Sequence, residues 1–206
     1  SLVLMAVPAF AAKGDMAFGV NGGLWMPMGK LAEGFDPAVA SSGADMQMGY
    51  DFGASFDYYV TKDIAIGADF SYSMSAMNDQ EIESTTYEEL LKAKTMQYGL
   101  HGKYFFPTGG PLTPYLSLGA SMYNRTFEFS EEFQDGMGML EEEVSSHAFG
   151  INGGLGLEYA VTPAVGIGVN GAYHYTFGEF KYEFEGSEEE TTLLDDWNYM
   201  TFNAAV

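Results

Sequence analysis

Residues 147–177 decide the fold, and they read HAFGINGGLGLEYAVTPAVGIGVNGAYHYTF. From position 149 to 161 every second residue is apolar or glycine, and the residues between them are small or polar. After Thr162 and Pro163 the same alternation resumes and continues to position 176. Period-two alternation on both sides of a tight turn predicts a β-hairpin with one apolar face. The other face is mostly Gly, Ala and Asn, which suits a crowded, hydrogen-bonded interior, whereas the apolar face suits lipid.

Six further segments repeat this alternation, and with the hairpin they make eight predicted strands: 15–26, 46–60, 64–74, 94–106, 113–127, 149–161, 165–176 and 197–206. Pro27 is expected to end the first strand. The connections alternate between long and short, as in bacterial outer-membrane barrels. The sequence therefore predicts an all-β fold: an eight-stranded, antiparallel, up-and-down transmembrane barrel with four long acidic outer loops and three short periplasmic turns.

Composition limits the function classes. The chain has 206 residues without a linker-like segment, so one domain is expected. Its formal charge of −21 argues against nucleic acid as a partner, and the absence of cysteine excludes disulfides and thiolate metal sites. Beyond the N-terminal segment no apolar run reaches 18 residues, so a membrane-spanning form must be a barrel.

The two ends carry expectations of their own. The apolar start closes with Ala9-Phe10-Ala11, a small-x-small pattern that predicts a partial signal peptide over 1–11 and a barrel domain over 12–206. A buried first strand or an incidental apolar start is the alternative for this segment. The chain ends at Val206 in the middle of a predicted strand, so a few C-terminal residues are expected to be missing.

Four segments carry a family resemblance: YYVTKDIAIGA (58–68), GKYFFP (102–107), PYLSLGA (114–120) and GLGLEYAVTP (154–163). They resemble the short-turn hairpins of the small outer-membrane β-barrel domain family, the group around the OmpA barrel, OmpX and OmpW. The resemblance covers nearly the whole mature chain, although such chains usually end in an aromatic residue and this one does not. It implies a monomer in the outer membrane of a Gram-negative-type bacterium, in contact with outer-membrane lipid and lipopolysaccharide. Because members differ mainly in their loops, it implies no specific function.

Charged side chains on the predicted inner face form the candidate site: Asp51, Asp57, Asp69, His101, Lys103, Arg125, Glu158 and His174. A charge in a low-dielectric interior is costly unless it is paired and hydrogen-bonded. Heights along the strands predict two layers. Lys103 should be surrounded by Asp57, Asp69 and Glu158, and Arg125 should approach Asp51. The cluster is either a salt-bridged filling or a gated polar path, and the narrow interior of an eight-stranded barrel favours the filling.

Most of the 29 acidic residues fall in the long connections. Hard oxygen ligands in such number suggest weak binding of divalent cations, with a solvated, self-repelling rim as the simpler alternative. Residues 79–90 do not fit an EF-hand, because Ser84 stands where glycine is needed and Leu90 where the bidentate Glu should be.

Catalysis has little support. A triad of Ser146, His147 and Glu143 is conceivable, but adjacent strand residues point to opposite faces, which works against a hydrogen bond between Ser146 and His147. The glycine-rich runs lack phosphate-loop spacing and are followed by no helix. We therefore expect no cofactor, no metal and no enzymatic activity.

The leading hypothesis is a non-enzymatic outer-membrane barrel with a structural or cell-surface interaction role exerted through its outer loops. The alternative is a narrow OmpW-like channel for small or apolar solutes or cations. A lipid-modifying barrel enzyme is a third hypothesis. A soluble ligand-binding barrel is disfavoured because it would expose a set of large aliphatic side chains to water: Leu116, Leu118, Ile151, Leu155, Leu157, Ile167 and Val169.

Overall fold

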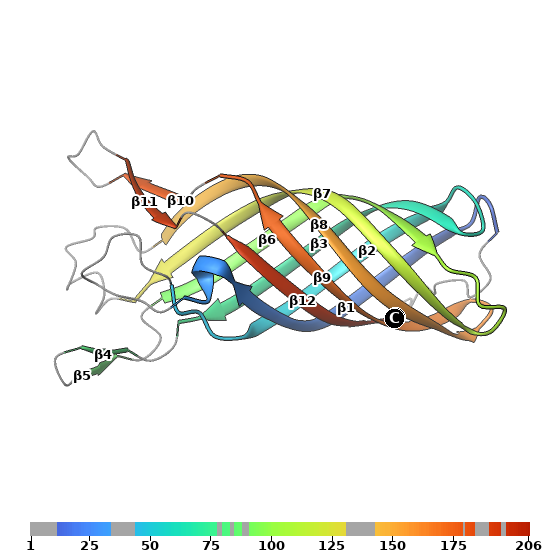
Figure 1. Ribbon diagram of the computed structural model, residues 1–206, viewed down its shortest axis with the longest axis horizontal. Helices are drawn as coiled ribbons and strands as arrows, with labels where there is room; N and C mark the ends of the chain where they lie inside the picture. The colour runs from blue at the N-terminus through green and yellow to red at the C-terminus, as the bar shows by residue number, and fades with distance from the viewer. Residues whose placement is uncertain are drawn as a thin grey trace, which may run out of the picture.

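The computed structural model describes residues 12–33, 44–77, 80–82, 85–87, 91–130, 143–178, 180–183, 190–194 and 197–206. Eight strands close into one barrel (Figure 1): β1 (Met16–Met28), β2 (Gly49–Tyr59), β3 (Ile64–Ala76), β6 (Leu91–Phe105), β7 (Leu112–Phe129), β8 (Glu143–Thr162), β9 (Val165–Thr176) and β12 (Asn198–Ala205). Each strand pairs antiparallel with the next barrel strand along the chain, and β12 pairs with β1. The predicted closed, eight-stranded antiparallel barrel is confirmed.

The two ends of the barrel differ. The connections β2–β3, β6–β7 and β8–β9 lie at the right of Figure 1, and we call this the turn end. The opposite, loop end carries the 3-10 helix η1 (Gly29–Leu31) and two small hairpins, β4 (Gln80–Ile82) with β5 (Thr85–Tyr87) and β10 (Phe180–Glu183) with β11 (Glu190–Leu194). Residues 1–11 and much of the acidic connections lie outside the described residues, so the signal-peptide and cation-binding predictions stay predictions.

Local hydrogen bonds show why the turn-end hairpins form where they do. In the β2–β3 turn, Thr61 Oγ1 accepts from the backbone N–H groups of Asp63 (3.2 Å) and Ile64 (3.0 Å). In the β8–β9 turn, Thr162 Oγ1 accepts from the N–H of Ala164 at 3.1 Å. A threonine hydroxyl that bonds the backbone two or three residues on stabilises a tight turn. Closing the sheet into a barrel then pairs the strand edges, which hydrocarbon surroundings require.

The assignment of the two faces is confirmed. The seven aliphatic side chains named above all point out of the barrel, with exposed fractions from 38% at Leu116 to 67% at Leu155. Inward residues of the same strands are buried or half-buried. The described part of the chain contains no helix long and apolar enough to cross a membrane.

Several local predictions are wrong. The sixth strand, predicted from position 149, begins at Glu143, and the fourth, predicted from position 94, begins at Leu91, because both continue their pairing with β7 beyond the expected loop boundary. Pro27 does not end the first strand: β1 continues to Met28, and Pro27 lies opposite Tyr199 of β12 near the strand end, where proline is tolerated. The second strand begins at Gly49, not at position 46. Met46 is buried at 3% exposure and Gln47 is exposed, the reverse of the predicted facing. Met46 donates its backbone N–H to Leu31 O and forms an isolated antiparallel bridge with Met77, just beyond the end of the neighbouring strand β3.

Candidate functional site

Ion pairs cross the interior near the turn end. Lys103 Nζ lies 2.7 Å from Asp57 Oδ2, and His101 Nε2 lies 2.7 Å from Asp57 Oδ1. On the other side of the ring, His101 Nδ1 lies 2.7 Å from Asp69 Oδ1. A carboxylate only accepts hydrogen bonds, so a doubly protonated imidazolium satisfies both contacts by donating from each ring nitrogen. The four groups then carry two positive and two negative charges, which makes their burial tolerable.

The missing side chain of Gly67 allows this arrangement. Gly67 of β3 lies opposite Asp57 on β2 and opposite His101 on β6. The imidazole therefore reaches across β3 to the carboxylate. A Cβ on Gly67 would lie 2.7 Å from His101 Nε2 and 2.8 Å from Asp57 Oδ1, so the pair occupies the space that any other residue would fill.

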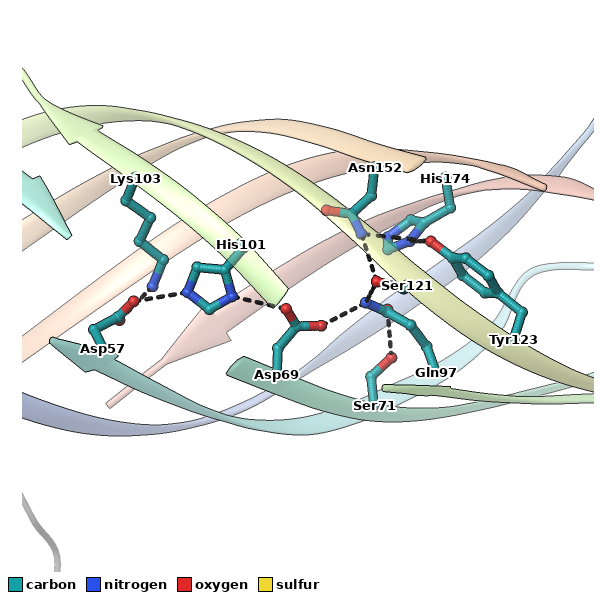
Figure 2. A network of polar contacts seen from close by, with 10 residues as sticks. All are labelled: Asp57, Asp69, Ser71, Gln97, His101, Lys103, Ser121, Tyr123, Asn152 and His174. Atoms are coloured by element: carbon teal, nitrogen blue, oxygen red, sulfur yellow. Dashed lines mark hydrogen bonds and ion pairs between the residues drawn. The ribbon is translucent and has the colours of Figure 1, made fainter. Parts of the chain in front are cut away.

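A chain of hydrogen bonds continues from Asp69 toward the loop end (Figure 2). Gln97 donates to Asp69 Oδ2 and to Ser121 Oγ, and it accepts from Ser71 Oγ at 3.1 Å. Asn152 Nδ2 donates to Ser121 Oγ at 3.0 Å and to Tyr123 Oη at 3.4 Å. Tyr123 Oη lies 3.2 Å from His174 Nδ1. We call the ten residues of Figure 2 the interior network: Asp57, Asp69, Ser71, Gln97, His101, Lys103, Ser121, Tyr123, Asn152 and His174.

His174 ends this network against aromatic rings. Its Nε2 lies 3.2 Å from Thr201 Oγ1, and its ring stacks on Tyr199 with centroids 4.4 Å apart and an interplanar angle of 7°. Both ring nitrogens thus have hydroxyl partners. These contacts are those of a packed structural histidine.

Asp51 lies in a separate polar group. Its Oδ2 accepts from Ser73 Oγ at 2.7 Å, and its Oδ1 accepts from Asn203 Nδ2 at 2.7 Å and Asn21 Nδ2 at 3.5 Å. The side chain is 1% exposed. Three donors from β1, β3 and β12 stabilise this carboxylate, and Arg125 is not among them.

Arg125 lies nearer the loop end. Its Nη2 donates to Ser146 Oγ at 2.9 Å, and its Nη1 lies 3.4 Å from Thr176 Oγ1 and from the carbonyl of Gly178. The guanidinium carbon lies 5.9 Å from the centre of the Trp197 ring, which adds a cation–π contact. The predicted approach of Arg125 to Asp51 is therefore wrong.

Clusters of buried, mostly apolar side chains lie at both ends of the interior. The turn-end cluster is Ala17, Tyr59, Ala65, Phe105 and Tyr115. The loop-end cluster is larger and contains both tryptophans: Trp25, Leu31, Ala44, Met46, Met77, Leu91, Ala93, Tyr123, Phe127, Val144, Trp197 and Tyr199. The alternation predicted that several of these rings face inward. It did not predict that they gather into clusters, because the residues of each cluster are scattered along the chain.

A cavity of about 140 Å³ lies between the two clusters. Asp51, Asp57, Asp69 and Glu158 line it together with Lys103 and His101. Glu158 thus shares the cavity with Lys103, as predicted, but Asp69 is bonded to His101 and Gln97, so Lys103 is not surrounded by three acids. Among the described residues, no group of His, Asp and Glu has an arrangement that holds a metal ion.

The proposed catalytic arrangement finds no support in the geometry. Ser146 Oγ is turned inward to Arg125, whereas His147 is exposed on the outer face. The two side chains point to opposite sides of β8, as the strand geometry requires.

Comparison with known proteins identifies the family. The family model for the outer membrane protein β-barrel domain matches residues 1–206. The chain belongs to this family. A search of curated proteins finds no match. Among solved structures, the fold is similar to that of Neisserial surface protein A (16% identity, TM-score 0.55, covering 93% of this chain and 97% of that one). It is also similar to OprG from Pseudomonas aeruginosa (15% identity, TM-score 0.53, covering 95% and 98%).

Membership of this family gives the location of the protein and the surroundings of the interior network. The family consists of non-enzymatic outer-membrane β-barrels, and this protein lies in the outer membrane of a Gram-negative bacterium. The exposed aliphatic and aromatic side chains of the wall therefore meet lipid. The interior network lies on the inner face of that wall, and through Tyr123 it joins the loop-end cluster.

Proposed function

We propose that this protein is a closed, non-conducting outer-membrane barrel that acts at the cell surface through the connections at its loop end. The observation that carries the proposal is a buried cluster of aromatic and aliphatic side chains at each end of the interior, with ion pairs and hydrogen bonds between the two clusters. A continuous water path would have to displace large buried rings such as Trp25 and Tyr59, which are 1% and 2% exposed.

The loop end is the side we assign to the exterior. In outer-membrane barrels the short turns face the periplasm and the longer connections face outward. Here residues 60–63, 106–111 and 163–164 join strands at the turn end, whereas 29–48, 77–90, 130–142 and 177–197 join them at the loop end. These four connections hold most of the acidic residues, so their partners are cations or cationic surfaces.

Conductance tests the closed interior. The purified protein, inserted in a planar bilayer, should show no steady open state. A Trp25→Ala/Tyr115→Ala double variant removes one ring from each cluster and should conduct, while a Tyr104→Ala variant, altered on the lipid face, should stay silent. Heat-modifiable gel migration verifies that each variant has folded.

A narrow channel is the competing function, and the acid-lined cavity is the observation that favours it. Its signature would be a steady, cation-selective conductance of the wild-type protein, which would refute the closed interior. Reduction of that conductance by Asp69→Asn would assign the path to the cavity.

Epitope insertion tests the surface role. A tag placed between Ser130 and Glu143 should be labelled by antibody on intact cells. The same tag placed between Gly109 and Gly110 should be labelled only after the outer membrane is opened. Labelling of the second tag on intact cells would reverse the proposed orientation.

A further inference from the structure

Methionine side chains gather on the outer wall of the barrel where β12, β1 and β2 approach the loop end. Met26 of β1 lies directly opposite Met200 of β12. On the other side of β1, Trp25 lies opposite Gly49, and continuing this register by one residue places Met48 beside Met26. The next outward residue of β1 is also a methionine. We call these four residues the thioether patch: Met26, Met28, Met48 and Met200.

The thioether patch lies outside the barrel. Trp25 and Tyr199 face the interior and are 1% and 0% exposed. Met26 and Met200 are the next residues along the same two strands, so they face outward, and both are half-buried. Met48 is 62% exposed. The four sulfur atoms are therefore not part of the interior clusters and are available to a ligand from outside.

The spacing of the patch lets its sulfur atoms converge. Side chains directly opposite each other on paired strands have Cβ atoms about 5 Å apart, and outward neighbours along one strand are about 7 Å apart. Met26 has such a neighbour on three sides: Met200, Met48 and Met28. Because a methionine side chain is unbranched and has three rotatable bonds, these sulfur atoms can reach a common point above Met26.

The height of the patch places it at the outer boundary of the membrane. Met26 lies ten residues along β1 from Met16, which pairs with Tyr58 near the turn end. At a rise of about 3.3 Å per residue and a tilt of about 40°, this separation is about 25 Å along the barrel axis. The apolar band of an outer-membrane barrel is about 25 Å tall, so ions in the surrounding water reach the patch.

The ligand chemistry of the patch differs from that of every other polar group in the chain. The sequence contains no cysteine, and the described His, Asp and Glu residues form no group that could hold a metal ion. Thioether sulfur is a soft, neutral ligand, and soft sulfur ligands select Cu(I), whereas carboxylate oxygens suit Ca²⁺ and Mg²⁺. Contact with lipid does not require sulfur, because leucine fills nearly the same volume.

Charge favours a cation at this end of the barrel. The formal charge of the chain is −21, and most of its acidic residues fall in the connections at the loop end. A field of this sign raises the local concentration of cations around the loop end. Neutral thioethers then supply the selectivity, because they coordinate a soft ion without adding a charge that would attract hard cations.

We propose that the thioether patch binds one Cu(I) ion, with Met26, Met48 and Met200 as ligands and Met28 as a fourth. The ion binds in the Cu(I) state and exchanges no electron with the protein. This metal site goes beyond the closed-barrel function and does not depend on it.

A silver titration tests the site. Ag(I) is a soft monovalent cation that keeps its oxidation state in air, so it stands in for Cu(I). The folded protein in uncharged detergent and chloride-free buffer is titrated with silver nitrate, and bound ions are counted by native mass spectrometry. Met26→Leu/Met200→Leu should bind silver at least about tenfold more weakly than the wild type, because it lacks two ligands. Equal affinity of the two proteins would overturn the proposal.

A matched variant distinguishes the patch from methionines in general. Met16→Leu/Met122→Leu also removes two outward thioethers, but Met16 lies opposite Tyr58 and Met122 opposite Tyr98, so neither belongs to the patch. Its silver affinity should equal that of the wild type. An equal loss in both double variants would show non-specific binding and refute the site. Leucine preserves volume and apolar character, and gel migration verifies that each variant has folded.

Methyl signals locate the ion without any substitution. In wild-type protein labelled with ¹³C at the methionine methyl groups, one equivalent of silver should shift the signals of Met26, Met48 and Met200. The signals of Met16 and Met122 should stay in place. Silver that binds without shifting the three patch signals would overturn the assignment, whatever the variants show.

Two further ions separate the thioether patch from the acidic connections. Calcium in excess should not displace silver, because carboxylates and not thioethers bind it. Displacement by calcium would assign the silver to the acidic connections and refute the patch. Cu(I), added without oxygen as its acetonitrile complex, should shift the same three methyl signals as silver. Unchanged signals with Cu(I) would refute the assignment to copper.

Discussion

The turn half and the loop half of the interior are filled in different ways. In the turn half, the cluster and the ion pairs come entirely from barrel strands: β1, β2, β3, β6 and β7 supply every member. In the loop half, residues between the strands enter the cluster as well. Leu31 of η1 is fully buried, and Ala44, Met46 and Trp197 are at most 4% exposed.

Short connections explain the difference. At the turn end the chain passes from strand to strand within a few residues, so among the described residues it is the strands that supply the side chains filling this half. At the loop end, η1 and the segment around Met46 are held by backbone bonds such as Met46 N to Leu31 O at 2.9 Å. We infer that the turn half is rigid and that the loop half can adjust when a side chain is lost.

The largest effect is expected from Asp57→Ala in the turn half. It leaves Lys103 and His101 buried with one carboxylate fewer, and removing one partner of a buried ion pair costs about 3–5 kcal/mol. Urea unfolding in lipid vesicles, followed by gel migration, measures the free energy of unfolding. A loss below about 1 kcal/mol would show that the ion pairs do not hold this half together.

Tyr115→Ala should cost nearly as much, about 3 kcal/mol, because the surrounding strands cannot collapse into the space left by the ring. Tyr115 packs between Phe105, with ring centroids 5.5 Å apart, and the inner face of Gly156. The same unfolding experiment applies, with the lipid-facing Tyr104→Ala as the matched control. Equal losses in the two variants would contradict the role of the turn-end cluster.

Leu31→Ala should cost about 2 kcal/mol, the low end for a buried leucine, because the loop half can move to fill the space. The protein's two tryptophans, Trp25 and Trp197, both lie in the loop-end cluster, so their fluorescence reports on this half alone. We expect a red shift of the emission while the gel migration of the folded barrel stays unchanged. If the gel migration of the folded barrel were lost at the same urea concentration at which the tryptophan emission shifts, the two halves would not be independent.

Lys62→Gln should have the smallest effect, within about 0.5 kcal/mol, because an exposed ion pair contributes little. The Lys62 side chain is 70% exposed and pairs with the adjacent Asp63. Unfolding in urea at low and high salt measures the change. A loss comparable to that of Asp57→Ala would mean that charge in general, and not burial, governs stability at the turn end.

The sequence predicted the facing of the strand residues well. Asp57, Lys103 and Tyr115 lie inside and Leu118 and Leu155 outside, as period-two alternation requires. The predicted contacts were less accurate: Lys103 does meet Asp57, but His101 stands between Asp57 and Asp69. Alternation gives the face of a residue but not its neighbour, because neighbours depend on the stagger of each strand against the next.

The predicted direction of the side chains is wrong where the chain leaves the strands. Met46 and Gln47 continue the alternation of β2 in sequence, yet Met46 turns into the mouth because its backbone bonds to Leu31. No local pattern signals this contact, since the two residues meet only after the barrel has brought η1 and the start of β2 together. The loop-end cluster could not be predicted for the same reason, since its members are brought together only by the closed barrel.

The sequence by itself determined that this chain is an eight-stranded barrel with a lipid-facing wall and a polar inner face, because the side-chain alternation of a strand is a property of the local backbone. Tertiary structure alone decided that Gly67 gives His101 room to bridge two aspartates, that Arg125 lies beside Trp197 and not Asp51, and that buried clusters with aromatic rings form at both ends. These features depend on register and closure, which join residues far apart in the chain.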